Sequence, residues 1–227
     1  MNLLEICLSS GYGGLELYMA KVAGYLASNK YNVRVMVRPG SFLDKRLGQQ
    51  GLACNYLRAS LHYLPLFAAL KLARYIRDKQ IDLIHVHHGK DLFLCVLAKV
   101  FAGRGRLVYT RQMALTRYKH DAYHRFVYRH VDAYLTITRA LQADAIRYLP
   151  IARERVQLLY YGVPQPPPDK TDCTQYLQDN GLDPAAFKVA IFGRVEAIKG
   201  QHLVVAAAAR LIREGHKLQA AIIGHVM

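Results

Sequence analysis

The chain has 227 residues, of which 52% are hydrophobic, so it contains enough apolar material for a folded core, and a disordered protein is excluded. Lys and Arg number 31 against 16 acidic residues, and the formal net charge of +15 favours anionic partners. No continuous basic tract or nucleic-acid-binding motif is present, so phosphorylated small molecules and membrane surfaces rank above nucleic acid, which we do not expect as a partner.

Cysteine usage and the N-terminal sequence indicate the compartment. The four cysteines are far apart and form no Cys-x-x-Cys pair, which is typical of proteins from a reducing cytosol. The N-terminus has no signal-peptide pattern, and no segment approaches the roughly 18 uninterrupted apolar residues of a membrane span. We therefore expect a cytoplasmic protein, attached at most peripherally to the inner face of the membrane.

Strand-like and helix-like segments alternate from the N-terminus onward, which predicts a parallel sheet with helices on both faces. The first strand is expected over 3–8, and a glycine-rich turn follows it before apolar residues recur at helical spacing over 15–26. Further strands are expected over 33–37, 54–57, 81–87, 106–110, 132–138 and 156–160, with helices between them. Residues 1–163 are thus predicted to form a Rossmann-like, doubly wound α/β domain.

A smaller unit is expected after a linker. The prolines that follow Val163 lack the N–H donors of a sheet, so 164–184 is predicted to be an extended linker. A strand at 187–192, a helix at 201–213 and a strand at 218–223 follow it. Two strands and one helix leave a large apolar face uncovered, so 185–227 is expected to be the incomplete start of a second Rossmann-like domain, in a chain that is truncated or covered by another chain.

Two loops at strand ends are candidate phosphate sites. Gly13 and Gly14 precede a helix whose free N–H groups suit a phosphate or a sugar oxygen, although a simple turn explains these glycines equally well. Arg194 and Lys199 bracket the second loop and are able to converge on one diphosphate; the alternative is a pair of solvated charges. Open α/β sheets bind ligands at the C-terminal ends of strands, which favours a functional role for the second loop.

Four segments together resemble glycosyltransferase family 4, whose members have the two-domain GT-B fold. They are Gly13-Gly14-Leu15-Glu16, the sequence Asp-Leu-Ile-His-Val-His at 82–87, Tyr161-Gly162-Val163-Pro164, and the pattern Gly-Arg-x-x-x-x-Lys-Gly at 193–200. The resemblance implies transfer of a sugar from a nucleotide diphosphate sugar to an acceptor with retention, without a cofactor or a required metal. It also implies that Gly13 and Gly14 lie at the donor site and that Arg194 and Lys199 stabilise the leaving diphosphate, a role that suits their charge.

The sequence departs from the family in two places. Gln112 stands where many members have a histidine two residues after a strand threonine, and glutamine can hydrogen-bond a sugar hydroxyl but cannot relay a proton. The acidic E-x7-E segment that binds the donor in the family is expected beyond Met227. The candidate acceptor-binding residues are His87, His88, Arg111, Gln112 and Lys119.

Two groups of histidines suggest metal sites, and we favour neither. His85, His87 and His88 lie at one strand end, but neighbours on a strand point to opposite faces and no nearby carboxylate-rich set completes a site. The sequence His-Asp-Ala-Tyr-His at 120–124 resembles a zincin motif with Asp in place of the longer Glu, which disfavours a metalloprotease. No metal is expected.

Residues 117–129 alternate basic and aromatic side chains, which predicts a basic, aromatic helix. Such a surface suits anionic lipid headgroups or a phosphorylated, lipid-linked acceptor. An amphipathic core helix with a solvated charged face explains the same pattern and is slightly favoured.

The leading hypothesis is a glycosyltransferase of cell-envelope or surface polysaccharide synthesis, such as lipopolysaccharide or capsule. Its partners are a nucleotide-sugar donor and a sugar or lipid-linked acceptor. The alternatives are an inactive fragment or non-catalytic partner subunit, and a GT-B-shaped nucleotide-sugar epimerase. A Rossmann oxidoreductase is least favoured because the first turn lacks the dinucleotide glycine pattern.

Overall fold

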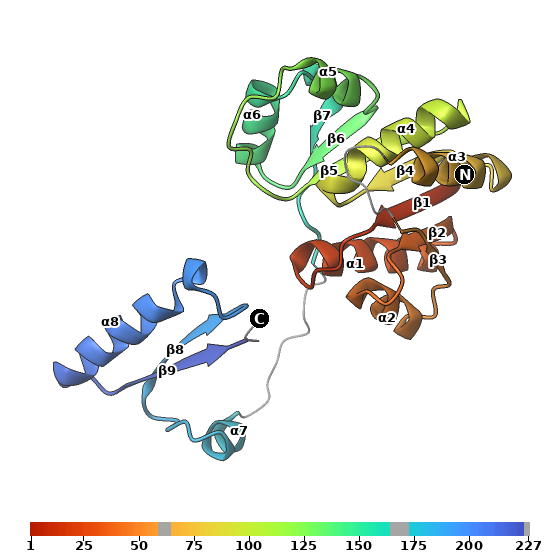
Figure 1. The fold of residues 1–227 in the computed structure, drawn as a ribbon. Coiled ribbons are helices and arrows are strands. Elements are labelled where there is room, and N and C mark those ends of the chain that lie inside the picture. Colours follow the sequence, from red (N-terminus) through yellow and green to blue (C-terminus); the bar gives the residue numbers. More distant parts are fainter. Residues whose placement is uncertain (59–64, 164–172, 225–227) are drawn as a thin grey trace. The chain divides into compact units, whose positions relative to one another are not determined.

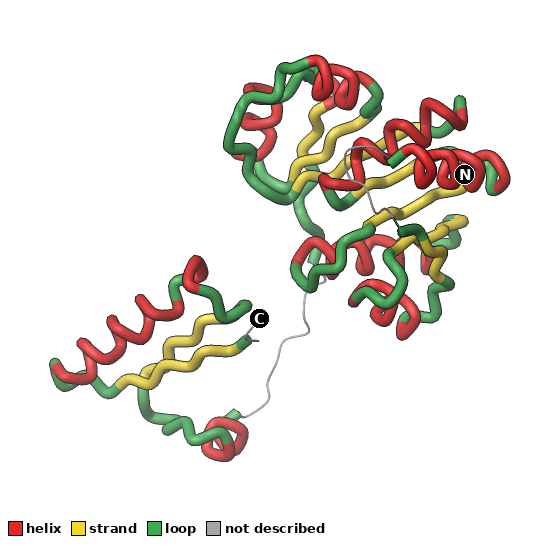
Figure 2. Tube along the Cα trace, in the orientation of Figure 1, coloured by secondary structure: helices red, strands yellow, loops and turns green. Residues whose placement is uncertain are grey.

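The computed structural model describes residues 1–58, 65–163 and 173–224. The chain divides into two compact units, Met1–Val163 and Pro164–Met227 (Figure 1). Residues 164–172 of the linker predicted at 164–184 lie outside the described residues, and its described part contains the short helix α7 (Thr174–Asp179), seen in Figure 2. Within the described residues, no helix is long and apolar enough to cross a membrane.

The first unit contains one seven-stranded sheet in which every neighbouring pair of strands is parallel. The strand order is β3-β2-β1-β4-β5-β6-β7, so the direction of winding changes between β1 and β4. The predicted doubly wound, Rossmann-like α/β fold is therefore confirmed. The strands are β1 (Asn2–Cys7), β2 (Asn32–Val37), β3 (Cys54–Tyr56), β4 (Leu83–Val86), β5 (Arg106–Arg111), β6 (Ala133–Thr136) and β7 (Val156–Leu158).

Helices cover both faces of this sheet (Figure 1). One core lies under α1 and α2 and includes Cys7 and Met19, while a larger core under α3, α4, α5 and α6 includes Ile6 and Leu94. The first unit contains α1 (Gly14–Ser28), α2 (Phe42–Gln49), α3 (Leu66–Asp78), α4 (Leu92–Ala102), α5 (Ala122–Arg129) and α6 (Arg139–Tyr148), with 3-10 turns η1 (Gly89–Asp91) and η2 (Arg153–Arg155).

The alternation of side chains along β1 determines which residues meet each helical layer. Leu4 and Ile6 point into the larger core, whereas Cys7 belongs to the core under α1 and α2. Because side chains two residues apart on a strand share a face, Glu5 lies on the α1 side together with Cys7. A charged residue is thus placed inside the sheet–helix layer, where it needs partners.

The second unit contains the parallel strands β8 (Phe187–Phe192) and β9 (Leu218–Ile223), the 3-10 turn η3 (Ala197–Lys199) and helix α8 (Gln201–Arg213). Its two strands end in closely packed glycines, because a Cβ at Gly224 would lie 1.8 Å from the carbonyl oxygen of Gly193. The unit buries little apolar surface: Phe187 and Phe192 are 70% and 73% exposed. A pair of strands covered by one helix cannot enclose both rings.

Candidate functional site

The C-terminal ends of β1, β4 and β5 lie at one edge of the sheet, because the strands are parallel and β4 pairs with both neighbours. The winding changes direction between β1 and β4, and open α/β sheets bind ligands beside such a change. The glycine turn before α1 follows β1, His87 and His88 follow β4, and Gln112 follows β5. The fold therefore brings candidate residues from three separate segments to one edge.

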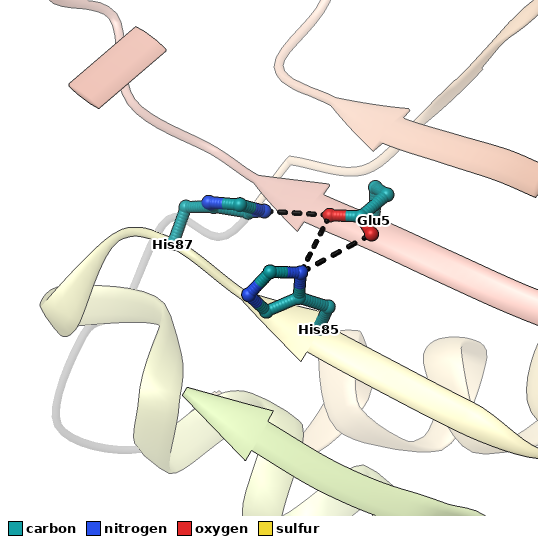
Figure 3. A group of neighbouring side chains, drawn as sticks. All are labelled: Glu5, His85 and His87. Atoms are coloured by element: carbon teal, nitrogen blue, oxygen red, sulfur yellow. Dashed lines mark hydrogen bonds and ion pairs between the residues drawn. The ribbon is translucent and has the colours of Figure 1, made fainter. Parts of the chain in front are cut away.

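The buried carboxylate of Glu5, on β1, contacts two histidines: His85 in β4 and His87 just after β4 (Figure 3). Glu5 is paired in register with His85, and its Oε1 lies 3.1 Å from Nδ1 of that residue. Nε2 of His87 lies 2.6 Å from Oε2 of Glu5. The exposed fraction is 1% for Glu5 and His87 and 8% for His85, so these bonds form out of contact with water.

The protonation of this cluster follows from its hydrogen bonds. Burial by itself raises the pKa of Glu5, but the charge of His85 and the hydrogen bonds from His85 and His87 outweigh it and lower the pKa to about 2. Burial, reinforced by His85, lowers the pKa of His87 to about 4, so its ring is neutral at pH 7. An ionised carboxylate only accepts hydrogen bonds, so Nε2 of His87 carries the proton and Nδ1 is an acceptor.

The acceptor nitrogen of His87 is the part of the cluster without a partner. Figure 3 shows this second ring nitrogen directed away from Glu5. Nδ1 of His87 is buried, and no described residue hydrogen-bonds to it, whereas Nε2 of His85 lies 2.7 Å from Oγ1 of Thr110. The cluster thus presents one unsatisfied hydrogen-bond acceptor.

Glu5, His85 and His87 also have the composition of a metal site. Each offers one ligand atom, and these atoms lie within 4.8 Å of one another. Carboxylate and imidazole are zinc ligands, and the contact of His85 with Thr110 is of the kind that orients a metal-bound ring. The sequence showed no carboxylate-rich set near these histidines, and the structure places one carboxylate, that of Glu5 on the neighbouring strand, beside His85 and His87. The cluster is nevertheless consistent without an ion, since two imidazole N–H groups already satisfy the carboxylate.

Helix α1 joins three of the sequence motifs. Tyr18, in the turn after the glycines, lies with its ring centroid 5.9 Å from that of His87 and 4.3 Å from that of Tyr161. Nζ of Lys21 donates to the carbonyl oxygen of Gly162 at 3.3 Å. The glycine turn, the histidine strand and the Tyr161-Gly162 segment are therefore packed around one helix face.

The glycine turn contains an acidic side chain. Gly13 caps α1 without a side-chain hydrogen bond, and the carboxylate of Glu16 lies 3.4 Å from the position of a Cβ on Gly13 and 3.1 Å from one on Gly11. Glu16 is buried. A negative group beside the helix N-terminus repels phosphate but accepts hydroxyl groups, so Gly13 and Gly14 are better suited to a sugar oxygen than to a phosphate.

The remaining acceptor candidates differ in how fully they are bonded. Arg111 donates from Nε to the carbonyl of Met113 at 2.6 Å and from Nη2 to the carbonyl of Ala114 at 3.0 Å, so its guanidinium holds its own loop. Nε2 of Gln112 is buried and has no partner among the described residues. Nδ1 of His88 lies 3.3 Å from the carboxylate of Asp91, which accepts from the N–H of Leu8. Lys119 lines a pocket beside η1.

The loop between β8 and α8 contains the two predicted diphosphate ligands. Arg194 is half-buried, and its Nη1 lies 3.0 Å from Oε1 of Glu196. The carbonyl of Arg194 accepts from Nε2 of Gln201 at 2.8 Å, which ties the loop to the first turn of α8. Lys199 is exposed and is followed by Gly200 in the left-handed conformation, with φ of +76°. Arg194 thus has an acidic partner that a diphosphate would replace.

Residues 12–165 match the family model of Glycosyltransferase Family 4. The chain belongs to glycosyltransferase family 4. The predicted family is therefore confirmed by a match that covers most of the first unit, from α1 onward, and includes His85 and His87.

Solved structures similar to this family 4 chain share its fold. HepE (Alr3699) from Anabaena in complex with UDP has a TM-score of 0.81 at 20% identity, over 100% of this chain and 62% of HepE. The lipopolysaccharide outer core galactosyltransferase WaaB matches with a TM-score of 0.63 at 17% identity, over 99% of this chain and 61% of WaaB. UDP-GlcNAc 2-epimerase from Neisseria meningitidis matches with a TM-score of 0.63 at 15% identity, over 98% of this chain and 65% of the epimerase chain.

These identities establish a common fold and nothing finer. The family 4 chain spans about three-fifths of the length of the structures that it matches. No curated protein sequence matched it significantly.

The sequence did not single out three further candidate residues of this family 4 chain: Glu5, Glu16 and Lys90. Lys90 lines the same pocket as Lys119. A charged residue inside the apolar run Leu-Leu-Glu-Ile-Cys was the available signal for Glu5. Glu16 was seen only as part of the glycine motif, and nothing along the sequence connects Lys90 with Lys119.

Proposed function

We propose that the protein transfers a sugar from a nucleotide diphosphate sugar to a hydroxyl group of an acceptor, and that the first unit binds the acceptor. The family match over 12–165 carries this proposal. It is supported by the cluster of Glu5, His85 and His87 beside the change in winding of the sheet, and by Gln112 after the neighbouring strand β5.

In the reaction, the bond between the anomeric carbon and the diphosphate oxygen breaks, and a bond from the acceptor oxygen to that carbon forms. The proton of the acceptor hydroxyl leaves with the diphosphate. Arg194 and Lys199 would neutralise the diphosphate, with Arg194 exchanging its contact to Glu196 for the phosphate oxygens. Because both are cations in one loop, the loss of either weakens donor binding.

We assign binding of the acceptor substrate to side chains that have a donor or acceptor atom without a hydrogen-bond partner among the described residues. Nδ1 of His87 is a lone-pair acceptor and Nε2 of Gln112 is a donor, and both lack partners among the described residues. A sugar hydroxyl satisfies one of each kind. Glu5 acts as a positioning residue: by accepting from Nε2 of His87 it determines that Nε2 carries the hydrogen and that Nδ1 remains an acceptor.

The finer assignment is a hexosyl-type transferase of envelope polysaccharide synthesis at the cytoplasmic face of the membrane, without a metal ion. The donor serves as co-substrate, and no cofactor is proposed. The excess of basic residues supports an acceptor that bears phosphate or lies near an anionic membrane.

A thermal-shift titration of the intact protein with nucleoside diphosphates tests the proposal. Stabilisation by one of UDP, GDP, ADP or their sugar conjugates is expected, because a ligand that binds only the folded state raises its melting temperature. The absence of any shift across this panel would count against a nucleotide-sugar enzyme.

A nucleotide-sugar epimerase is the second candidate, because an epimerase structure shares the fold. Product analysis distinguishes the two. An epimerase converts a labelled donor without any acceptor, whereas a transferase leaves the donor sugar unchanged until an acceptor is present.

A further inference from the structure

A pocket of about 400 Å³ opens beside the sheet edge in the first unit. Its walls come from the segment after β4, from the loop after β5 and from α5. The residues that matter here are Gly89, Lys90, Phe93, Lys119, Tyr123 and Tyr128. The pocket is a separate place from the Glu5 cluster, none of whose members line it.

Two unpaired cations line this pocket. Neither Lys90 nor Lys119 forms an ion pair with any acid in the parts of the chain that the structure describes. No acidic residue lines the pocket: Asp121 and Asp91 lie outside the lining, where Oδ2 of Asp121 is 2.6 Å from Nδ1 of His124 and Asp91 accepts from the N–H of Leu8 at 2.7 Å. The pocket therefore has an excess of positive charge.

The charge on Lys119 is unfavourable in the free protein. Burial lowers the pKa of Lys119, the positive charges of Arg111 and Arg117 lower it further, and the charge of Asp121 opposes them only in part. An anion bound in the pocket would offset the repulsion from the two arginines. Such relief appears as affinity for the anion.

Four aromatic side chains, together with Leu92 and Val127, line the rest of the pocket. The ring centroids of Phe93 and Tyr123 lie 4.9 Å apart, and the rings of His124 and Tyr128 are stacked with centroids 6.3 Å apart. Apolar ring faces suit the non-phosphate part of a ligand, such as a pyranose ring or the first isoprene unit of a lipid. The pocket thus combines a place for an anion with a place for an apolar surface.

Gly89 fixes the depth of this pocket. A Cβ on Gly89 would lie 2.8 Å from Oη of Tyr109 and 3.4 Å from Nη1 of Arg111, so a larger residue would have to displace one of these β5 side chains. Glycine thus permits a close approach between the segment that contains Lys90 and the side chains of β5.

We propose that this pocket binds a phosphate or diphosphate group of the acceptor, held by Lys90 and Lys119, with the adjoining sugar or isoprenoid on the aromatic wall. The inference rests on the proposed transferase function and specifies its acceptor as a phosphorylated one. The same charges would attract the headgroup of a membrane phospholipid, so the test separates the two sources of phosphate.

Isothermal titration calorimetry of the intact protein with farnesyl diphosphate provides the test, with the nucleoside diphosphate found in the thermal-shift panel present in excess to occupy the donor site. The variant Lys90→Ala/Lys119→Ala is compared with the wild type and with the control Lys45→Ala, a change of an exposed lysine on α2. We expect at least about a tenfold loss of affinity in the double variant and none in the control, since two charge-assisted hydrogen bonds are removed.

Three outcomes decide the proposal. Equal affinity of the wild type and the double variant for farnesyl diphosphate would overturn it. So would the absence of farnesyl diphosphate binding in a wild type that binds a nucleoside diphosphate. A membrane headgroup would replace the acceptor phosphate in the account if three results came together. The wild type would bind phosphatidylglycerol vesicles better than phosphatidylcholine vesicles, the double variant would lose this preference, and farnesyl diphosphate would not bind. Failure of the wild type to bind any nucleoside diphosphate, by contrast, tests the transferase function.

Discussion

Nε2 of His87 lies 2.6 Å from Oε2 of Glu5, although the two residues are 82 positions apart in the chain. The parallel register of β1 and β4, which pairs Glu5 with His85, produces this contact. An ion-like hydrogen bond in a buried layer is stabilising only while both partners are present. The contact therefore links the stability of the first unit to the geometry of its candidate site.

Substitution of Glu5 by Gln is expected to lower the free energy of unfolding by about 2 kcal/mol, because one of the two imidazole N–H groups then meets an amide N–H₂ instead of an acceptor. Urea unfolding followed by circular dichroism measures the change. The exposed Glu154→Gln on η2 is the matched control and should leave stability within about 0.5 kcal/mol. Equal effects of the two substitutions would contradict the role of Glu5.

The stability of the first unit should fall on acidification from neutral pH. His87 has a folded pKa of about 4 against an ordinary value of 6.5, so the unfolded chain binds more protons between these limits, and stability present above pH 6.5 is lost as the pH falls towards 4. Glu5, with its pKa lowered from 4.5 to about 2, extends the loss to lower pH. Between pH 7 and 5 the His87 contribution is on the order of 2 kcal/mol.

Gln in place of His87 removes this titration while keeping an N–H donor for Glu5. The pH dependence of unfolding between pH 7 and 5 should become shallower in His87→Gln and remain unchanged in His120→Gln, an exposed control. Parallel pH profiles for wild type and His87→Gln would show that the ring is not held neutral by burial.

Replacement of Arg194 or Lys199 by Ala should weaken binding of the nucleoside diphosphate by about 10- to 100-fold, the usual effect of losing one charge-assisted hydrogen bond. Arg213→Ala, on the exposed side of α8, is the control and should bind normally. Calorimetric titration with the nucleotide found in the thermal-shift panel measures the affinities. Full affinity in both variants would place the diphosphate elsewhere.

Removal of metal ions is expected to leave the protein unchanged, because the N–H groups of His85 and His87 already satisfy Glu5. The melting temperature and the nucleotide affinity are compared before and after dialysis against EDTA, together with the metal content of the untreated protein. One zinc per chain and a lower melting temperature after chelation would identify the cluster of Glu5, His85 and His87 as a metal site.

The sequence predicted the fold better than the site, for a physical reason. Hydrophobic periodicity is local, so the strand expected at 81–87 is present as β4 (Leu83–Val86), and the helix expected before the strand at 106–110 is α4 (Leu92–Ala102). Asp91 ends the 3-10 turn before this helix, and its carboxylate accepts from the N–H of Leu8, a contact that no local pattern contains. Helix α7 was missed because the prolines before it extended the predicted linker too far.

The site depends on register and loop contacts that bring distant segments together. Glu5 and His85 are 80 positions apart in the chain. Lys90 and Lys119 line one pocket because the loop after β5 lies beside the segment after β4. Motif order therefore placed His87 and Gln112 at strand ends of the same sheet edge, but it did not indicate the carboxylate between the histidines. A charged residue within an apolar strand indicates that a partner must lie nearby in the fold, because a buried charge needs one.

Transfer of label from a panel of radiolabelled nucleotide diphosphate sugars to a bacterial lipid and polysaccharide extract tests the central claim most directly. The intact protein should move label from one donor into an acceptor product and release the nucleoside diphosphate, and Arg194→Ala/Lys199→Ala should not. Recovery of all label in the donor, or in an epimer of the donor sugar without any acceptor product, would contradict a glycosyltransferase.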